Sequence, residues 1–201
     1  MRFLEDVGFS LTPWSDIIYI ELADLTVKDA SQGVTATVAK STIQNPNGFG
    51  HGKDDGEILI GRAAAGVMEL AKSEPSHNLT LIDSIQFPNT IDNPSYFQDP
   101  YVKETGRDAS GYVIAGLARA IDFPSPEDPV VVWLVQLGGA ATSSGTWIRR
   151  KLFEDDGKTL STASTAVLVA IDPKENAGKK QAWLFVTGPM SSGVGVSRVD
   201  L

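Results

Sequence analysis

The sequence predicts an all-β protein: a partial β-propeller of about three four-stranded antiparallel blades, or half of a six-bladed ring. Short apolar runs bounded by Gly, Asn, Asp and Pro recur along the 201 residues, whereas helical periodicity is weak. A second observation is a repeated pattern, in which a polar opening leads to an apolar run ended by Gly and then to another strand. The closing glycines, Gly61, Gly116 and Gly188, are 55 and 72 residues apart, which suits four-stranded blades with loop insertions.

The predicted blades follow one another within a single domain, residues 1–201. A partial first blade is expected over roughly 14–40, complete blades over 41–88 and 89–154, and a last blade of three strands over 155–201. The expected strands lie at 17–22, 34–38, 58–60, 67–70, 79–87, near 91, and at 112–117, 130–137, 147–153, 166–171, 182–186 and 194–199.

Three segments need separate interpretation. Residues 45–52, Asn-Pro-Asn-Gly-Phe-Gly-His-Gly, form the first polar opening and predict a turn, because glycine permits positive φ and close approach of the backbone. Asp54-Asp55-Gly56 predicts a further turn directly before a strand. Residues 63–72 are compatible with a short amphipathic helix by propensity, but the repeat favours a strand there.

Composition limits the partners and the compartment. A net charge of −8 and a pI near 4.7 argue against nucleic acid, whose affinity depends on clustered Lys and Arg, and favour metal cations. The absence of Cys excludes disulfides and thiolate metal sites. The longest apolar stretch, 130–141, is too short to span a bilayer, and the first residues contain no apolar signal segment. We therefore expect a soluble, cytoplasmic protein with no membrane partner.

Several short motifs occur in a characteristic order. They are Asn47-Gly48, Asp54-Asp55-Gly56, Thr90-Ile91-Asp92-Asn93, Phe153-Glu154-Asp155-Asp156-Gly157 and Ser164-Thr165-Ala166-Val167. In this order they resemble the C-terminal half of the serum paraoxonase/arylesterase family, and the resemblance extends from about Trp14 onward. Members of this family are six-bladed β-propeller lactonases and esterases with calcium in the central channel.

The resemblance implies a calcium-dependent hydrolase of lactones or aryl esters, with Asn47, Asp92 and Asn93 as metal ligands. Side-chain oxygens of Asn and Asp suit calcium, which takes six to eight oxygen ligands. The ion would act as a Lewis acid on the substrate carbonyl. A purely structural role for these three residues also stays open, because Asn-Gly and Asp-Asn-Pro are common turn sequences. The family's remaining ligands come from blades to which no part of this chain corresponds.

The catalytic base is harder to assign, because the family's catalytic histidines also lie outside the matching half. His51 follows Asn47 by four residues, so strand periodicity places both on one face, where His51 could act as general base. The alternative is a structural histidine in a Gly-rich turn. A second functional class therefore stays open: a non-hydrolytic propeller relative that binds a small molecule or catalyses a different, biosynthetic reaction.

The strand count also predicts assembly. The sheets would form an open arc of about half a ring, which exposes apolar blade faces at both ends. Such faces are normally covered by neighbouring blades, so we expect a homodimer.

Overall fold

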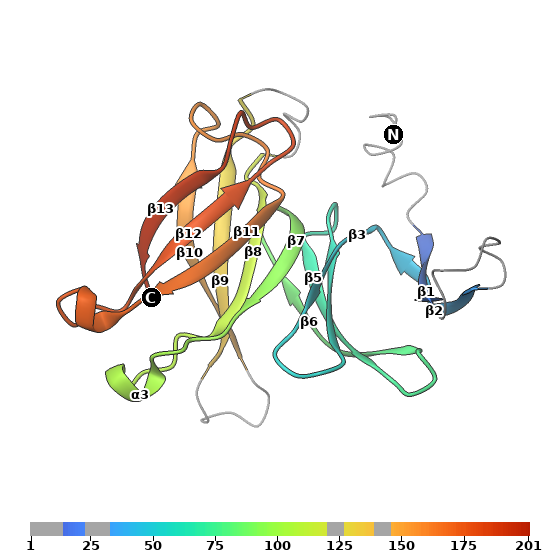
Figure 1. The fold of residues 1–201 in the computed structure, drawn as a ribbon. Helices are drawn as coiled ribbons and strands as arrows, with labels where there is room; N and C mark the ends of the chain where they lie inside the picture. Colours follow the sequence, from blue (N-terminus) through green and yellow to red (C-terminus); the bar gives the residue numbers. More distant parts are fainter. Residues whose placement is uncertain (1–13, 23–32, 120–126, 139–145) are drawn as a thin grey trace.

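The computed structural model describes residues 14–22, 33–119, 127–138 and 146–201, and these parts of the chain are almost entirely β-sheet (Figure 1). The all-β prediction is confirmed. Two short helices lie wholly within the described ranges, α3 (Val102–Thr105) and the 3-10 helix η3 (Pro173–Glu175), and no described helix is long and apolar enough to cross a membrane. The strands are β1 (Trp14–Leu22), β2 (Val34–Gln44), β3 (Pro46–His51), β4 (Glu57–Arg62), β5 (Val67–Ser73), β6 (Leu79–Gln86), β7 (Thr90–Phe97), β8 (Gly111–Leu117), β9 (Val130–Leu137), β10 (Trp147–Asp155), β11 (Thr165–Ile171), β12 (Gln181–Thr187) and β13 (Gly195–Asp200).

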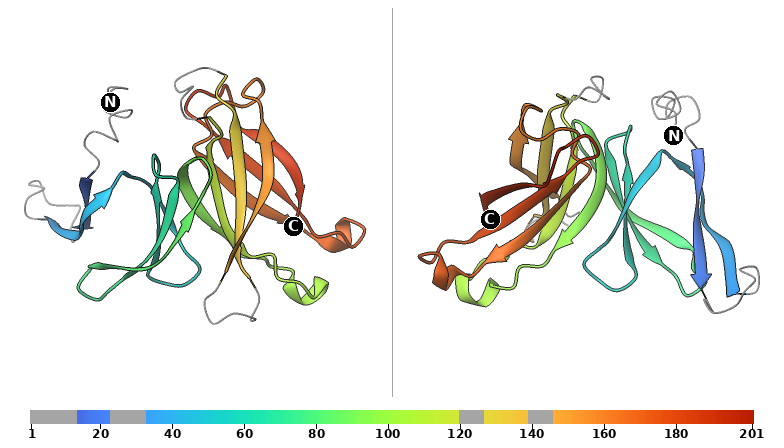
Figure 2. Two further views of the ribbon diagram at one scale, coloured as in Figure 1. Left: turned by 180° about the vertical axis from the view of Figure 1, so that it is seen from behind. Right: turned by 45° about the horizontal axis from the view of Figure 1, so that its top comes forward.

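Three sheets follow one another through the molecule (Figure 2). β1 and β2 form a two-stranded sheet, and β3-β4-β5-β6 form a four-stranded antiparallel sheet in chain order. A seven-stranded sheet has the order β10-β9-β8-β7-β11-β12-β13. Its neighbours are antiparallel except β7 and β11, which are joined in parallel by the pairing of Asn93 with Thr165. The sheet is curled into a half-barrel.

The predicted turn over residues 45–52 is wrong, since Pro46–His51 is strand β3. Its glycines serve close packing: a β-carbon on Gly50 would lie 2.1 Å from the carbonyl oxygen of Pro94 on β7. The turn at residues 54–56 is confirmed, with Gly56 at φ +80°. The helical alternative for residues 63–72 is also wrong, because a tight turn with Gly66 at φ +61° leads directly into β5.

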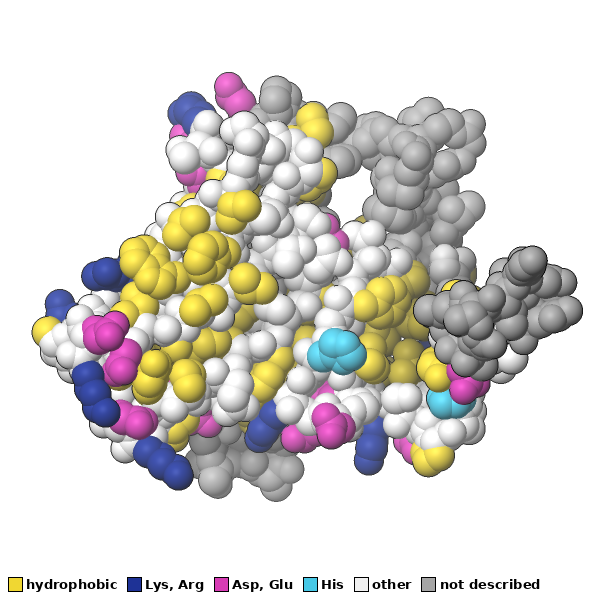
Figure 3. All heavy atoms as spheres, viewed as in Figure 1, with side chains coloured by type: hydrophobic (Ala, Val, Ile, Leu, Met, Phe, Trp, Pro, Cys, Tyr) yellow, Lys and Arg dark blue, Asp and Glu magenta, His cyan; other side chains and the backbone are white. Residues whose placement is uncertain are grey.

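One part of the core lies inside the curl of the seven-stranded sheet, and a second part lies between that sheet and the sheet of β3–β6. Strand β8 is buried on both faces because its residues alternate between two hydrophobic clusters. Val113 and Ala115 pack toward β11–β13, in a cluster that includes Leu168 and Leu184. Tyr112 and Ile114 pack toward β3–β6. The sheet of β11–β13 is covered on one face only, and hydrophobic side chains gather on its other face (Figure 3).

A buried ion pair ties the loop after β7 to the start of β12. The Lys180 ammonium group donates hydrogen bonds to the Asp99 carboxylate and to the Arg107 carbonyl oxygen. The side chains of Lys180 and Asp99 are only 7% and 1% exposed. Burial by itself raises the pKa of Asp99, but the bonds from Lys180 and from the N–H groups of Ala109 and Tyr101 outweigh it and hold this pKa below its usual value.

Candidate functional site

The predicted metal ligands come together where β3, β7 and β11 lie side by side. Asn47 on β3 donates from Nδ2 to Oδ1 of Asp92 on β7, at 2.9 Å. The next residue, Asn93, donates from Nδ2 to the Ser164 hydroxyl at 2.9 Å and to the Thr165 hydroxyl at 3.2 Å. Ser164 and Thr165 belong to one of the motifs that carry the family resemblance, but the resemblance does not assign them to the site. They complete the polar cluster, which consists of Asn47, Asp92, Asn93, Ser164 and Thr165.

The backbone determines where the oxygens of this cluster lie. The N–H of Asn93 donates to the carbonyl oxygen of Ser164 at 3.0 Å, which positions β11 beside β7. Because the Asn93 amide nitrogen is directed toward β11, its Oδ1 lies toward β3 instead. A β-carbon on Gly48 would lie 2.7 Å from that oxygen. Glycine at position 48 therefore leaves space beside the Asn93 oxygen.

Asp92 is the charged member of the cluster. Burial raises its pKa above the usual value, while hydrogen bonds from the Ser164 side chain and the Asn93 backbone act in the opposite direction. The net effect is that the ionised carboxylate is less favourable here than in water. A cation beside Asp92 would offset this cost.

The donor set fits calcium. It offers one carboxylate, two amide oxygens and two hydroxyl groups, all of them oxygen donors of the kind that calcium accepts. Among the described residues no three His, Asp or Glu side chains lie close enough to hold a metal, so a site here depends on the amides. In the present geometry Asn47 directs its nitrogen toward Asp92, so its amide has to turn before Asn47 and Asp92 can bind one ion through oxygen.

His51 lies at the far end of β3. Asn47, Phe49 and His51 are all exposed and alternate along the strand, so Asn47 and His51 share one face as their spacing predicts. Four residues of strand correspond to about 13 Å. Direct proton transfer requires hydrogen-bond distance, so a water molecule held at Asn47 would be out of reach of His51. The second histidine, His77, stacks on Tyr19 with ring centroids 4.0 Å apart.

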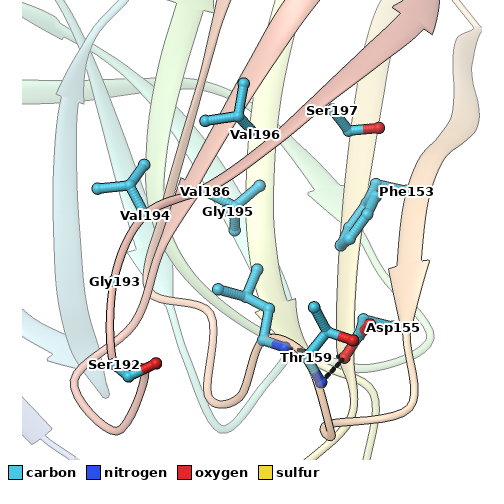
Figure 4. Close-up of a pocket in the computed structure, with 11 residues that line it drawn as sticks. Phe153, Asp155, Thr159, Val186, Ser192, Gly193, Val194, Gly195, Val196 and Ser197 are labelled. Carbon is cyan, nitrogen blue, oxygen red and sulfur yellow. Dashed lines mark hydrogen bonds between the residues drawn. The ribbon is translucent and has the colours of Figure 1, made fainter.

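A hollow of about 400 Å³ lies elsewhere, between β10 and β13 (Figure 4). Its only carboxylate is Asp155, whose Oδ2 accepts hydrogen bonds from the N–H groups of Gly157, Thr159 and Leu160 at 2.9, 3.2 and 3.1 Å. This carboxylate closes a turn and is not presented to a ligand. The other residues lining the hollow are Phe153, Val186, Ser192, Gly193, Val194, Gly195, Val196 and Ser197, none of which is a general base. The polar cluster is therefore the better candidate site.

Comparison with protein-family models and with curated proteins finds no match for this chain. The family resemblance consequently depends on the sequence motifs themselves.

Proposed function

We propose that the chain is a calcium-dependent hydrolase of lactones or aryl esters, with calcium held by Asn47, Asp92 and Asn93. The observation that carries the proposal is the 2.9 Å contact between Asn47 and Asp92, which are 45 residues apart and were both selected from sequence motifs. The neighbouring Asn93 adds a third oxygen on the β3 side.

We also propose that the sheets are blades of a propeller arc. Two groups of four strands, β3–β6 and β7–β10, run antiparallel in chain order, and β11–β13 form a third group of three. The first strands of the three groups are neighbours, because β7 contacts both β3 and β11. This order of strands supports the propeller blades that the sequence repeat predicts.

In this mechanism the residues of the cluster have distinct tasks. Asp92 supplies the negative charge, and Asn93 is oriented by its hydrogen bonds to Ser164 and Thr165. Asn47 reaches the same point from the neighbouring sheet. When bound, calcium would polarise the ester or lactone carbonyl and stabilise the developing oxyanion.

The test is the thermal stability of the protein with and without calcium. A ligand that binds only the folded state stabilises it by mass action, by about 2.7 kcal/mol at one hundred times Kd. We expect this stabilisation in the wild type and its loss in Asn47→Ala and Asp92→Ala. Asp54→Ala, which removes an exposed carboxylate from a turn, is the matched control and should respond as the wild type does. An equal response of all four proteins would exclude this site.

The raised pKa of Asp92 gives the calcium response a pH dependence. Calcium needs the ionised carboxylate, so protons compete with it as the pH falls through the pKa of Asp92. Because burial raises that pKa, calcium affinity should begin to weaken at a higher pH than at a site built on exposed aspartates. Calorimetric titrations with calcium between pH 7 and pH 4 measure this directly. An affinity independent of pH over that range would contradict a role for Asp92.

A second candidate is a binding module without hydrolytic activity, and the distance between His51 and Asn47 favours it. We expect His51→Ala to leave calcium-linked stabilisation unchanged, because His51 lies about 13 Å along the strand. Hydrolysis of an aryl acetate and of an aliphatic lactone then separates the candidates. Hydrolysis by the wild type that is lost in Asp92→Ala supports the hydrolase, whereas calcium binding without hydrolysis in the wild type supports the binding module.

A further inference from the structure

The chain enters β11 through Thr162, a residue in a strained conformation. Its φ is +53°, in the left-handed region that a β-branched residue rarely adopts. Thr162 is 1% exposed and lies two residues before Ser164 of the polar cluster. A buried residue keeps so unfavourable a conformation only where its surroundings hold it there, and such residues collect at functional sites.

The place of this strain in the fold is specific. Among the described residues five other than glycine have a positive φ, and of these only Asn45 and Thr162 are buried. Asn45 lies two residues before Asn47, the cluster member on β3. Thr162 has the same spacing from Ser164, directly before β11. Because asparagine adopts a positive φ more readily than threonine, Thr162 is the buried position at which this conformation costs most.

Hydrogen bonds to other parts of the chain hold Thr162 in place. Its hydroxyl donates to the carbonyl oxygen of Ser161 at 2.8 Å and accepts from the N–H of Met190 at 3.0 Å. The Thr162 N–H donates to the carbonyl oxygen of Asp128 at 3.3 Å. A β-carbon on Gly188 would lie 2.1 Å from the Thr162 carbonyl oxygen, so the backbone after β12 packs directly against this residue. The Thr162 hydroxyl thus fastens the segment before β11 to the loop after β12.

Ser164 transmits this constraint to the cluster. Its hydroxyl accepts a hydrogen bond from Asn93 Nδ2 at 2.9 Å and donates one to the Asp92 carboxylate. Its carbonyl oxygen accepts from the Asn93 N–H at 3.0 Å. Only Ala163 separates Ser164 from Thr162, so a change of backbone conformation at Thr162 would displace the hydroxyl and the carbonyl of Ser164 together.

We propose that Thr162 is a positioning residue for the polar cluster and that it orients Asn93 through Ser164. Its hydroxyl keeps the chain in the conformation in which Ser164 faces Asn93 and Asp92. The consequence for calcium rests on the proposed function. The orientation of the Asn93 amide does not, because it is a property of the protein without any ligand.

The experiment follows the side-chain amide of Asn93 in nitrogen–proton correlation spectra without calcium, with its signal identified by its loss in Asn93→Asp. Thr162→Val removes the hydroxyl but keeps the size and branching of the side chain, and we expect it to shift the Asn93 signal. Thr162→Ser keeps the hydroxyl and should restore the signal to its wild-type position. Thr42→Val is the matched control, because Thr42 also has a positive φ, of +55°, but is exposed on β2 outside the cluster.

Calcium affinity, measured by calorimetric titration, is the second measurement. Changing a residue that orients a metal ligand lowers metal affinity by about 10–100-fold. Because Thr162 acts through Ser164, we expect a loss of about tenfold in Thr162→Val. Thr162→Ser and Thr42→Val should bind calcium as the wild type does.

Each outcome has a definite meaning. An Asn93 signal at its wild-type position in Thr162→Val would overturn the proposal, and so would an unchanged calcium affinity in that variant. Absence of calcium binding in the wild type would instead refute the proposed function, and the Asn93 signal alone would then decide the role of Thr162. A residue that only stabilises the fold would lower Tm in Thr162→Val without displacing this signal.

Thr162→Gly covers the case in which Thr162→Val does not fold. Glycine adopts a positive φ without strain, which offsets part of the stability lost with the hydroxyl. Circular dichroism confirms the strand content of each variant. Thr162→Gly should show a displaced Asn93 signal and weaker calcium binding, and a wild-type signal in this variant would count against the proposal as it does in Thr162→Val.

Discussion

Lys180→Met is expected to lower the free energy of unfolding by about 3–5 kcal/mol, the largest effect of any substitution considered in this chain. Lys180 and Asp99 are almost completely buried and pair directly, so removal of the ammonium group leaves a buried carboxylate with only the two backbone N–H donors. For a chain of this length each kcal/mol corresponds to roughly 2–4 °C in Tm. Denaturant unfolding of both proteins at neutral pH measures the difference.

The matched control is Lys158→Met. Lys158 pairs with Asp156 at 2.7 Å, but these side chains are 70% and 63% exposed, and pairs exposed to this extent contribute little to the free energy of unfolding. Equal losses in the two variants would show that burial does not determine the contribution of the Lys180 pair.

The same ion pair gives a pH test with a definite sign. The pKa of Asp99 is lower in the folded protein than its usual value of about 3.8, so its stabilising contribution is complete above that value and is lost as the pH falls through the folded pKa. A protonated Asp99 is neutral and no longer needs Lys180. The stability difference between wild type and Lys180→Met should therefore shrink in acid. A difference that stays constant down to pH 3 would contradict this account.

Gly50→Ala is expected to destabilise the protein by about 2–3 kcal/mol through overpacking. The new β-carbon would lie 2.1 Å from the carbonyl oxygen of Pro94, and that oxygen belongs to backbone held in register by the pairing of Pro94 with Ile114. No flexible side chain can move aside. The entropic advantage of Ala over Gly in the unfolded chain, about 0.4–1 kcal/mol, is smaller than the clash. Thermal unfolding provides the measurement.

Gly193→Ala controls for the substitution itself. A β-carbon on Gly193 meets no atom within 4 Å, so this variant should be neutral or slightly stabilised. If Gly50→Ala is as stable as Gly193→Ala, then β3 and β7 do not approach as closely as described.

Most strands could be predicted from the sequence because apolar runs and turn residues are local signals. Residues 130–137 and 182–186 are examples, and both lie within observed strands, β9 and β12. Strand β3 could not be predicted in this way. Its glycines are usual in turns, and their reason for being there, contact with the backbone of β7, is visible only in three dimensions. Local propensity fails where tertiary packing selects the residue.

Only part of the polar cluster could be predicted from the sequence, because some of its contacts also depend on tertiary packing. Asn47, Asp92 and Asn93 were predicted as one site from the family resemblance. Ser164 and Thr165 belong to the same set of motifs, but their contact with Asn93 depends on the parallel pairing of β11 with β7, which the local sequence does not indicate. Sequence spacing placed His51 on the same face as Asn47, and the same spacing, applied to an extended strand, gives the separation of about 13 Å. The ion pair of Lys180 with Asp99 spans 81 residues, and nothing in either local sequence indicates it.

The junction of β7 with β11 has a consequence for the order of folding. Most other strand pairs join neighbours in the chain and can form early, but Asn93 and Thr165 are 72 residues apart, and closing so long a loop carries an entropic cost before any contact is gained. This junction is therefore expected to form after the hairpins on either side of it. Interactions made after the transition state act mainly on the rate of unfolding. A ligand held between β7 and β11 would accordingly prolong the lifetime of the folded chain and leave the speed of its folding almost unchanged.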